Sequence, residues 1–210
     1  MIRILVLASV VFMTSIALTI DAVSSVPALP FYDSPDLTPR WARSVDHRIA
    51  DFDLVAQDGS RFRRADLIGR VHVATFIYTR CAGVCPAMVS QLSKVQKAIA
   101  KRTDAVLVSY TVTPQQDTSE MLARFGEARS IDSRVWKLVT GDPEQIYSLA
   151  RASYFADDGR LDAKSPVSEQ FLHTEKALLV DREGRLRGVY NATVPRDIEK
   201  LIADLELLTK

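Results

Sequence analysis

The 210-residue sequence predicts an α/β fold, in which a mixed β-sheet is covered by helices on both faces. Apolar segments of strand length alternate with segments whose apolar residues recur at helical spacing, from about residue 46 to the end of the chain. Hydrophobic residues make up 47% of the chain, which is enough for a sizeable core. One domain of about 150 residues with a preceding extension fits this length.

Each element follows from a local pattern. Runs rich in β-branched and aromatic residues predict strands over 52–55, 71–78, 105–112, 135–140, 176–181 and 185–190. Helical spacing and start signals predict helices over 85–100, 117–128, 142–152 and 198–208. Asp117 and Glu120 have the spacing of a capping box, and Asp142 before Pro143 is typical of a helix start. The polar stretch 155–168 is expected to be a long surface loop.

The N-terminal region predicts attachment to a membrane. Residues 1–21 contain an apolar run over 4–20 that follows Arg3, typical of a signal segment or a single membrane anchor. A poor cleavage pattern at residues 22–24 favours the uncleaved anchor. Residues 22–45 hold four prolines and are expected to form an extended linker. We therefore expect the domain over 46–210 to lie outside the cytoplasm, on the periplasmic side of the inner membrane.

The only two cysteines of the chain, Cys81 and Cys85, lie where a predicted strand passes into a predicted helix. Pro86 suits the first helical position, which places Cys85 at about the N-cap. Unpaired helix N–H groups and the helix dipole favour thiolate over thiol there. Two thiolates on one short loop are typical of a redox pair or of a soft-metal site. A structural disulfide is the weaker alternative, because so short a loop constrains little of the unfolded chain.

Three histidines are candidates for a further metal ligand. His72 lies inside a predicted central strand, so we expect it to be packed or hydrogen-bonded, and His47 is expected at the surface. His173 comes just before the strand that begins at Lys176. If that strand lies beside the strand over 71–78, His173 faces the cysteines and can complete a low-coordinate site with two sulfurs.

Composition excludes other classes of function. The chain has 27 Lys+Arg against 26 Asp+Glu, so no basic excess is available for a nucleic-acid backbone. Neither a P-loop nor a dinucleotide glycine motif is found.

From about Leu29 to Leu208 the chain resembles the Sco/SenC family, thioredoxin-fold copper proteins that serve cytochrome c oxidase assembly. Four motifs in this order carry the resemblance: Cys81-Ala82-Gly83-Val84-Cys85-Pro86, Gln116-Asp117-Thr118, the stretch over 136–141, and His173 followed by the stretch over 177–184. The resemblance implies a thioredoxin-like fold and one copper ion, Cu(I) or Cu(II), bound by Cys81, Cys85 and His173.

The chain departs from the family pattern at two positions. Leu172 stands where the family often has Asp before the ligand histidine, and Thr113-Pro114 stands where it usually has Asp-Pro. A missing carboxylate beside a ligand changes histidine orientation and copper affinity. The partner implied by the resemblance is a copper-bearing oxidase subunit, or another copper acceptor.

Other functions compete with that of a copper carrier. In a thiol–disulfide reductase, Cys81 would attack a partner's disulfide and Cys85 would resolve the intermediate. Two features count against general oxidoreductase activity. Three residues separate the cysteines, not the two of thioredoxin-type motifs. No proline comes immediately before Lys176, where thioredoxin-like oxidoreductases have one, and the nearest upstream is Pro166. A peroxidase of the peroxiredoxin type is disfavoured, because the threonine expected three residues before the cysteine is missing. A zinc site is disfavoured, because no fourth ligand is evident nearby.

Overall fold

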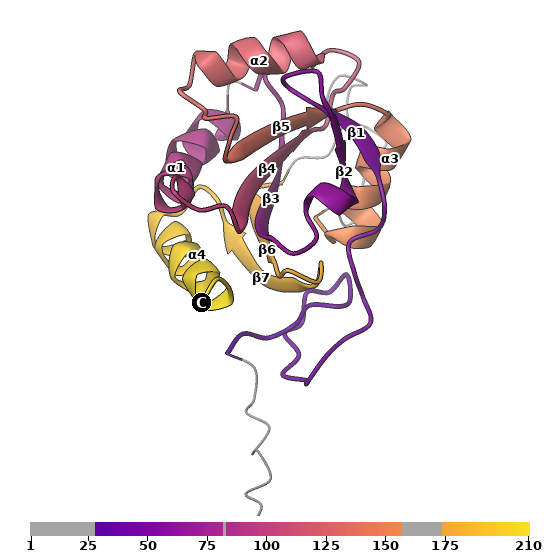
Figure 1. Ribbon diagram of the computed structural model, residues 1–210, viewed down its shortest axis with the longest axis vertical. Helices are drawn as coiled ribbons and strands as arrows, with labels where there is room; N and C mark the ends of the chain where they lie inside the picture. Colours follow the sequence, from indigo (N-terminus) through magenta and orange to yellow (C-terminus); the bar gives the residue numbers. More distant parts are fainter. Residues whose placement is uncertain (1–27, 82, 157–173) are drawn as a thin grey trace, which may run out of the picture.

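In the residues that the structure describes, seven strands form one mixed sheet in the order β2-β1-β5-β4-β3-β6-β7 (Figure 1). This computed structural model describes residues 28–81, 83–156 and 174–210. The strands are β1 Asp53–Ala56, β2 Arg61–Arg63, β3 Val71–Ile77, β4 Ala105–Thr111, β5 Trp136–Thr140, β6 Lys176–Val180 and β7 Leu186–Asn191. Strands β3, β4 and β5 are parallel, whereas β1 and β6 pair antiparallel with β5 and β3. The mixed sheet confirms the predicted α/β class.

Four α-helices cover the sheet in the described part of the chain. They are α1 Val84–Ile99, α2 Ser119–Glu127, α3 Pro143–Ser148 and α4 Pro195–Leu208. A 3₁₀ turn over Arg64–Asp66 follows β2, and a π-helical turn over Leu149–Ser153 extends α3. Helices α1 and α4 contribute to the core on one face of the sheet, and α3 contributes to the core on the other face.

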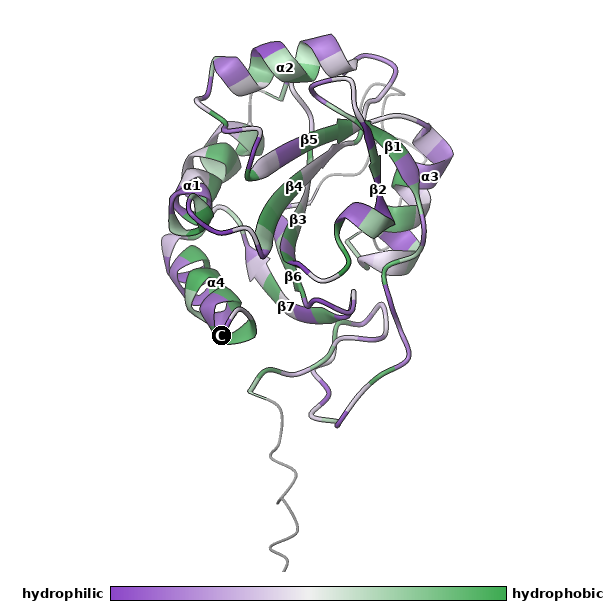
Figure 2. Ribbon diagram, viewed as in Figure 1, coloured by the Kyte–Doolittle hydropathy of each residue, from purple (hydrophilic) through white to green (hydrophobic). Residues whose placement is uncertain are grey.

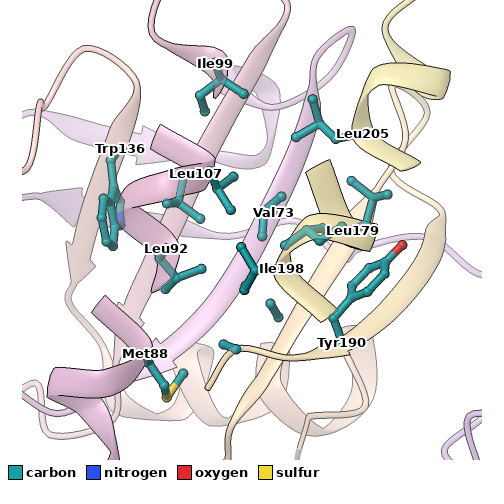
Figure 3. Close-up of a cluster of buried hydrophobic side chains, with 14 of the residues drawn as sticks. Val73, Met88, Leu92, Ile99, Leu107, Trp136, Leu179, Tyr190, Ile198 and Leu205 are labelled. Atoms are coloured by element: carbon teal, nitrogen blue, oxygen red, sulfur yellow. The ribbon is translucent and has the colours of Figure 1, made fainter. Parts of the chain in front are cut away.

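The sheet is buried most deeply at its centre, because helices cover both of its faces. All seven residues of β3 and all seven of β4 are buried, which is why these segments read as mainly apolar runs. In Figure 3, Leu92 of α1 and Ile198 of α4 lie near Val73 of β3, and Met88 and Leu205 belong to the same core on either side of them. In Figure 2 strand β4 is mainly hydrophobic, whereas the helices carry both hydrophobic and hydrophilic segments.

Most predicted elements form, and the differences lie at their ends. Helix α2 begins one residue after its cap Thr118, whose side chain accepts from the N–H of Met121, so Asp117 does not cap it. Asp142 does cap α3, with its carboxylate accepting from the N–H of Gln145. The three-residue strand β2 was not predicted, because its alternation is too short to recognise. The expected surface loop at 155–168 lies outside the described residues from 157 onward.

Residues 28–45, which composition predicts to be an extended linker, are in contact with the domain. Phe31 is 2% exposed, and its backbone pairs with Arg40. The Arg187 guanidinium donates to the carbonyl oxygens of Leu29 and Pro30 at 2.6 and 3.0 Å, and lies over the Phe31 ring. The N–H of Tyr32 donates to the carbonyl of Leu186, at the start of β7. Proline content predicted an extended chain, but these long-range contacts hold it against the sheet edge.

Candidate metal centre

The segment between β3 and α1, which we call the cysteine loop, contains Cys81. The N–H of Cys81 donates to the carbonyl of Tyr78 at 3.2 Å, which closes a tight turn after the strand. Gly83 is the N-cap of α1, and the helix begins at Val84. Cys85 therefore lies in the first turn of the helix and not at its cap, with Pro86 in the third helical position. That turn has no intrahelical acceptors for its N–H groups, so the missing N–H of Pro86 costs nothing.

The two cysteines are free thiols in unequal surroundings. Cys85 is 7% exposed, whereas Cys81 is partly exposed. Burial, the Cys81 thiol and the Asp117 charge together raise the pKa of Cys85, against a backbone hydrogen bond from Tyr78. Burial also works against ionisation of Cys81, but hydrogen bonds from the Cys85 side chain and from helix-start N–H groups outweigh it and lower its pKa. The accessible sulfur is thus the one that ionises more readily.

Strand β6 begins beside this loop. The antiparallel register pairs Ala74 with Leu178 and His72 with Val180, so Lys176 lies near the carboxyl end of β3. Thr174 and Glu175, which precede the strand, therefore lie at the same end of the sheet as the cysteine loop, where β3 finishes. The condition on which the His173 prediction depended, that these two strands are neighbours, is met. His173 itself lies outside the described residues.

A buried carboxylate, Asp117, lies against the cysteine loop with 0% exposure. It accepts hydrogen bonds from the Thr79 hydroxyl and, at 3.2 Å, from the Thr79 N–H. It also accepts from the hydroxyls of Thr111 at 2.6 Å and Thr113 at 3.0 Å. A carboxylate with this many donors fastens the start of the cysteine loop to the end of β4 and the loop after it.

Local sequence reasoning assigned Asp117 to a helix cap and missed this role. The available signal was the set of hydroxyl residues after two neighbouring buried strands, Thr79 after β3 and Thr113 after β4. The carboxyl ends of parallel strands meet at one edge, which brings such residues together. Thr113 occupies the position of the absent family Asp, and its hydroxyl donates to Asp117.

The two other histidines lie elsewhere. His72 is 1% exposed, with Nε2 3.1 Å from the Tyr154 hydroxyl, which confirms the expectation of a packed and hydrogen-bonded residue. Burial, as the main cause, lowers the pKa of His72 to about 3. His47 is half-buried and not at the surface, because its ring stacks on Phe155 and its Nε2 lies 2.8 Å from the carbonyl of Ser153.

Within residues 28–81, 83–156 and 174–210, no three Cys, His, Asp or Glu side chains are grouped as a metal site would require. The described residues also contain no helix of the length and apolarity that a bilayer crossing demands. The predicted anchor over residues 1–21 lies outside them. The two thiols are therefore the part of the predicted three-ligand set that the structure describes.

Cys81 and Cys85 nevertheless fit a soft metal ion. Two thiolates on adjacent turns of one short segment are the donor type that Cu(I) prefers over harder cations. The partly exposed Cys81 leaves the ion an approach from solvent. Asp117 adds a negative charge near Cys85, which favours a bound cation.

Known proteins of similar sequence and structure point to the same kind of site. The chain is 27% identical over 165 residues to the SCO1 protein homolog of Bacillus subtilis, covering 77% of this chain and 83% of the relative. A solved structure of BsSco, described as a member of the Sco family of cytochrome c oxidase assembly proteins with a disulfide switch, matches with a TM-score of 0.66 at 25% identity. That match covers 79% of this chain and 95% of BsSco.

A third protein, Bradyrhizobium japonicum ScoI, was solved with copper bound. It matches with a TM-score of 0.60 at 25% identity, covering 76% of this chain and 98% of ScoI. These likenesses confirm the predicted thioredoxin-like fold. The SCO1/SenC family model matches residues 42–210, which is most of the chain. The protein therefore belongs to the SCO1/SenC family.

Proposed function

We propose that this protein is a membrane-tethered, extracytoplasmic copper carrier that assists assembly of the copper centre of cytochrome c oxidase. The observation that carries the proposal is the pair of free thiols, with Cys81 in the loop before α1 and Cys85 in the first turn of that helix. The copper-bound state of Bradyrhizobium japonicum ScoI and the assembly role stated for BsSco support the choice of cargo and pathway. The tether is the apolar segment within residues 1–21.

Cys81 and Cys85 would hold the copper ion through sulfur, and His173 would complete the ligand set through one ring nitrogen. The start of β6 supports this choice, because residues 174 and 175 lie at the same end of the sheet as the cysteine loop. A low-coordinate ion beside a partly exposed thiol can be taken over by the ligands of an acceptor. The acceptor is the copper-bearing subunit of the oxidase or another copper protein.

Titration of the reduced full-length chain in detergent with Cu(I) tests this proposal. We expect one tightly bound copper per chain, lost in Cys81→Ser and weakened at least about tenfold in His173→Ala, since each change removes one ligand. His47→Ala is the matched control, because His47 contacts Ser153 and Phe155 and lies outside the site. Equal affinity in wild type and His173→Ala would remove His173 from the ligand set, and no tight binding would reject the carrier.

A thiol–disulfide reductase is the second candidate, and the unequal exposure of the two thiols favours it. The Cys81 thiolate would attack one sulfur of a partner's disulfide, forming a mixed disulfide and releasing one partner thiolate. The Cys85 thiol would then lose its proton and attack the Cys81 sulfur, releasing the second partner thiolate as the Cys81–Cys85 disulfide forms. The disulfide switch described for BsSco supports such a cycle.

This alternative has its own assay. The reduced chain is mixed with the oxidised form of a peptide that carries the two cysteines of an oxidase copper site. A reductase converts one peptide disulfide to two thiols per chain, and Cys85→Ser stops at the mixed disulfide. A carrier without this activity leaves the peptide oxidised while still binding copper.

A further inference from the structure

The end of the molecule opposite the cysteine loop exposes large apolar side chains that the proposed function does not use. Of the four large hydrophobic residues exposed in the described part of the chain, three lie there: Trp41 at 60%, Ile68 at 45% and Leu207 at 42%. We call Trp41, Ile68 and Leu207 the basal face. Exposed apolar groups gathered at one end of a domain usually mark a contact surface.

Backbone contacts place these residues at one end. The N–H of Gly69, next to Ile68, donates to the carbonyl of Arg182 at 2.8 Å. The Arg182 guanidinium is directed at the carbonyl of Leu208, the neighbour of Leu207, at 3.5 Å. Trp41 and Leu207 line the same open groove of about 420 Å³. Figure 1 shows this end with the turn between β6 and β7 and the C terminus of α4.

The chain enters the described structure at the basal face. Ala28, its first described residue, lines the same groove as Trp41 and Leu207. Only residues 21–27 separate it from the apolar run over 4–20, a span of at most about 25 Å for a fully extended chain. If that run is inserted in a bilayer, the basal face is held within this distance of the bilayer surface.

Three basic side chains near the basal face lie beside carboxylates. Lys200 pairs with Asp204, Arg182 lies 2.9 Å from Asp104, and Arg40 lies 2.9 Å from Asp33. Because these three basic groups are already paired, apolar contact would contribute more to association of this surface than they do. Trp with neighbouring Lys and Arg side chains is the composition found at membrane–water interfaces.

We propose that the basal face rests on the lipid bilayer, with Trp41, Ile68 and Leu207 inserted at the headgroup level. Strand β3 runs from this end to the cysteine loop, so its seven residues put about 20 Å between the bilayer and the thiols. The docked domain presents Cys81 and Cys85 away from the membrane in a fixed orientation. This inference rests on the proposed membrane tether and is independent of copper binding.

The test uses the full-length chain in phosphatidylcholine vesicles that carry a spin label near the headgroup. The chain has two tryptophans, and Trp136 is fully buried, so lipid-dependent quenching of fluorescence reports Trp41. We expect quenching in the wild type and none in Trp41→Phe. In the Ile68→Asp/Leu207→Asp variant, quenching falls at least about twofold, because charged groups resist transfer into the interface. Cu(I) affinity stays unchanged in both variants.

Flotation of the vesicles separates the two possible failures. A chain that floats with the vesicles but whose Trp41 is quenched by aqueous iodide, and not by labelled lipid, overturns the docking inference alone. A chain that does not float overturns the tether and the docking together and leaves the copper titration to be judged separately. Equal lipid quenching in the double variant would also overturn the role of the basal face.

Discussion

Two carboxylates, Asp117 and Asp181, are buried at opposite ends of the sheet and have different partners. Asp181 is 4% exposed and follows β6, where it accepts from the guanidinium groups of Arg185 at 2.8 Å and Arg187 at 3.2 Å. Asp117 is 0% exposed and accepts from threonine hydroxyls and one backbone N–H. One buried charge meets two cations, whereas the other meets only neutral donors among the bonds that the structure describes.

The difference separates a structural role from a role at the site. The charge of Asp181 is compensated by arginines, and Arg187 carries this network on to the carbonyl oxygens of residues 29 and 30. The charge of Asp117 is not compensated in this way, so its field reaches Cys85. A copper ion on the cysteines would supply a cation at that end of the sheet. Substitutions at His72, Asp181, Asp117 and Thr79 test this difference, from the largest expected effect to the smallest.

The largest effect is expected from a third buried group, His72, which shows the cost of a charge without a partner. Its folded pKa of about 3 lies below the ordinary value of 6.5, with burial as the main cause, partly offset by Asp181 and increased by Arg70. The fold therefore favours the neutral ring. Its contribution to stability is complete above pH 6.5 and is lost as the pH falls from 6.5 to 3, by about 4 kcal/mol.

Urea unfolding of wild type and His72→Leu over this pH range measures the effect. The variant should lose much less stability on acidification than the wild type, because it has no ring to protonate. Parallel pH profiles for the two proteins would show that His72 is not the group responsible.

Asp181→Asn should destabilise the fold by about 3 kcal/mol, because it leaves the buried Arg187 without its counter-charge. Cu(I) affinity should stay within about twofold of wild type, since the change lies at the end opposite the cysteines. Chemical denaturation and copper titration of the same sample check both halves. A large fall in copper affinity would mean that the two ends of the sheet are coupled.

Asp117→Asn should cost about 2 kcal/mol in stability, because charge-assisted hydrogen bonds to the threonines are lost. Unlike Asp181→Asn, it should also weaken Cu(I) binding by about tenfold, because both the nearby charge and the anchor of the cysteine loop are removed. The same two measurements apply. The contrast between the buried carboxylates fails if the two Asn variants affect copper equally.

Thr79→Val should have the smallest effect, about 1 kcal/mol, because it removes one hydroxyl donor and leaves the Thr79 N–H bonded to Asp117. We expect a fall of a few fold in Cu(I) affinity from the loosened loop. Thr79→Ser retains the hydroxyl and should restore the affinity. If Ser and Val behave alike, the hydroxyl does not position the loop.

Much of the fold was predictable because its signals are local. The alternation of strands and helices follows from apolar spacing, and the cap at Asp142 follows from a four-residue pattern. The position of Cys81 and Cys85 between a strand and a helix was equally local. The error of two residues in placing the start of α1, where Gly83 and not Cys85 is the cap, is of the size expected for helix ends.

The sequence by itself determined the α/β class, the strand–helix junction that carries both cysteines, and the family resemblance. Only the tertiary structure decided that Asp117 bonds Thr79, 38 positions away, and that Arg187 holds residues 29 and 30, more than 150 positions away. Local periodicity says nothing about such pairs, because they depend on which strands are neighbours in the sheet. The order of β3, β4, β6 and β7 in the sheet brings these distant residues together. It therefore makes Asp181 a structural carboxylate and places Asp117 beside the cysteine loop.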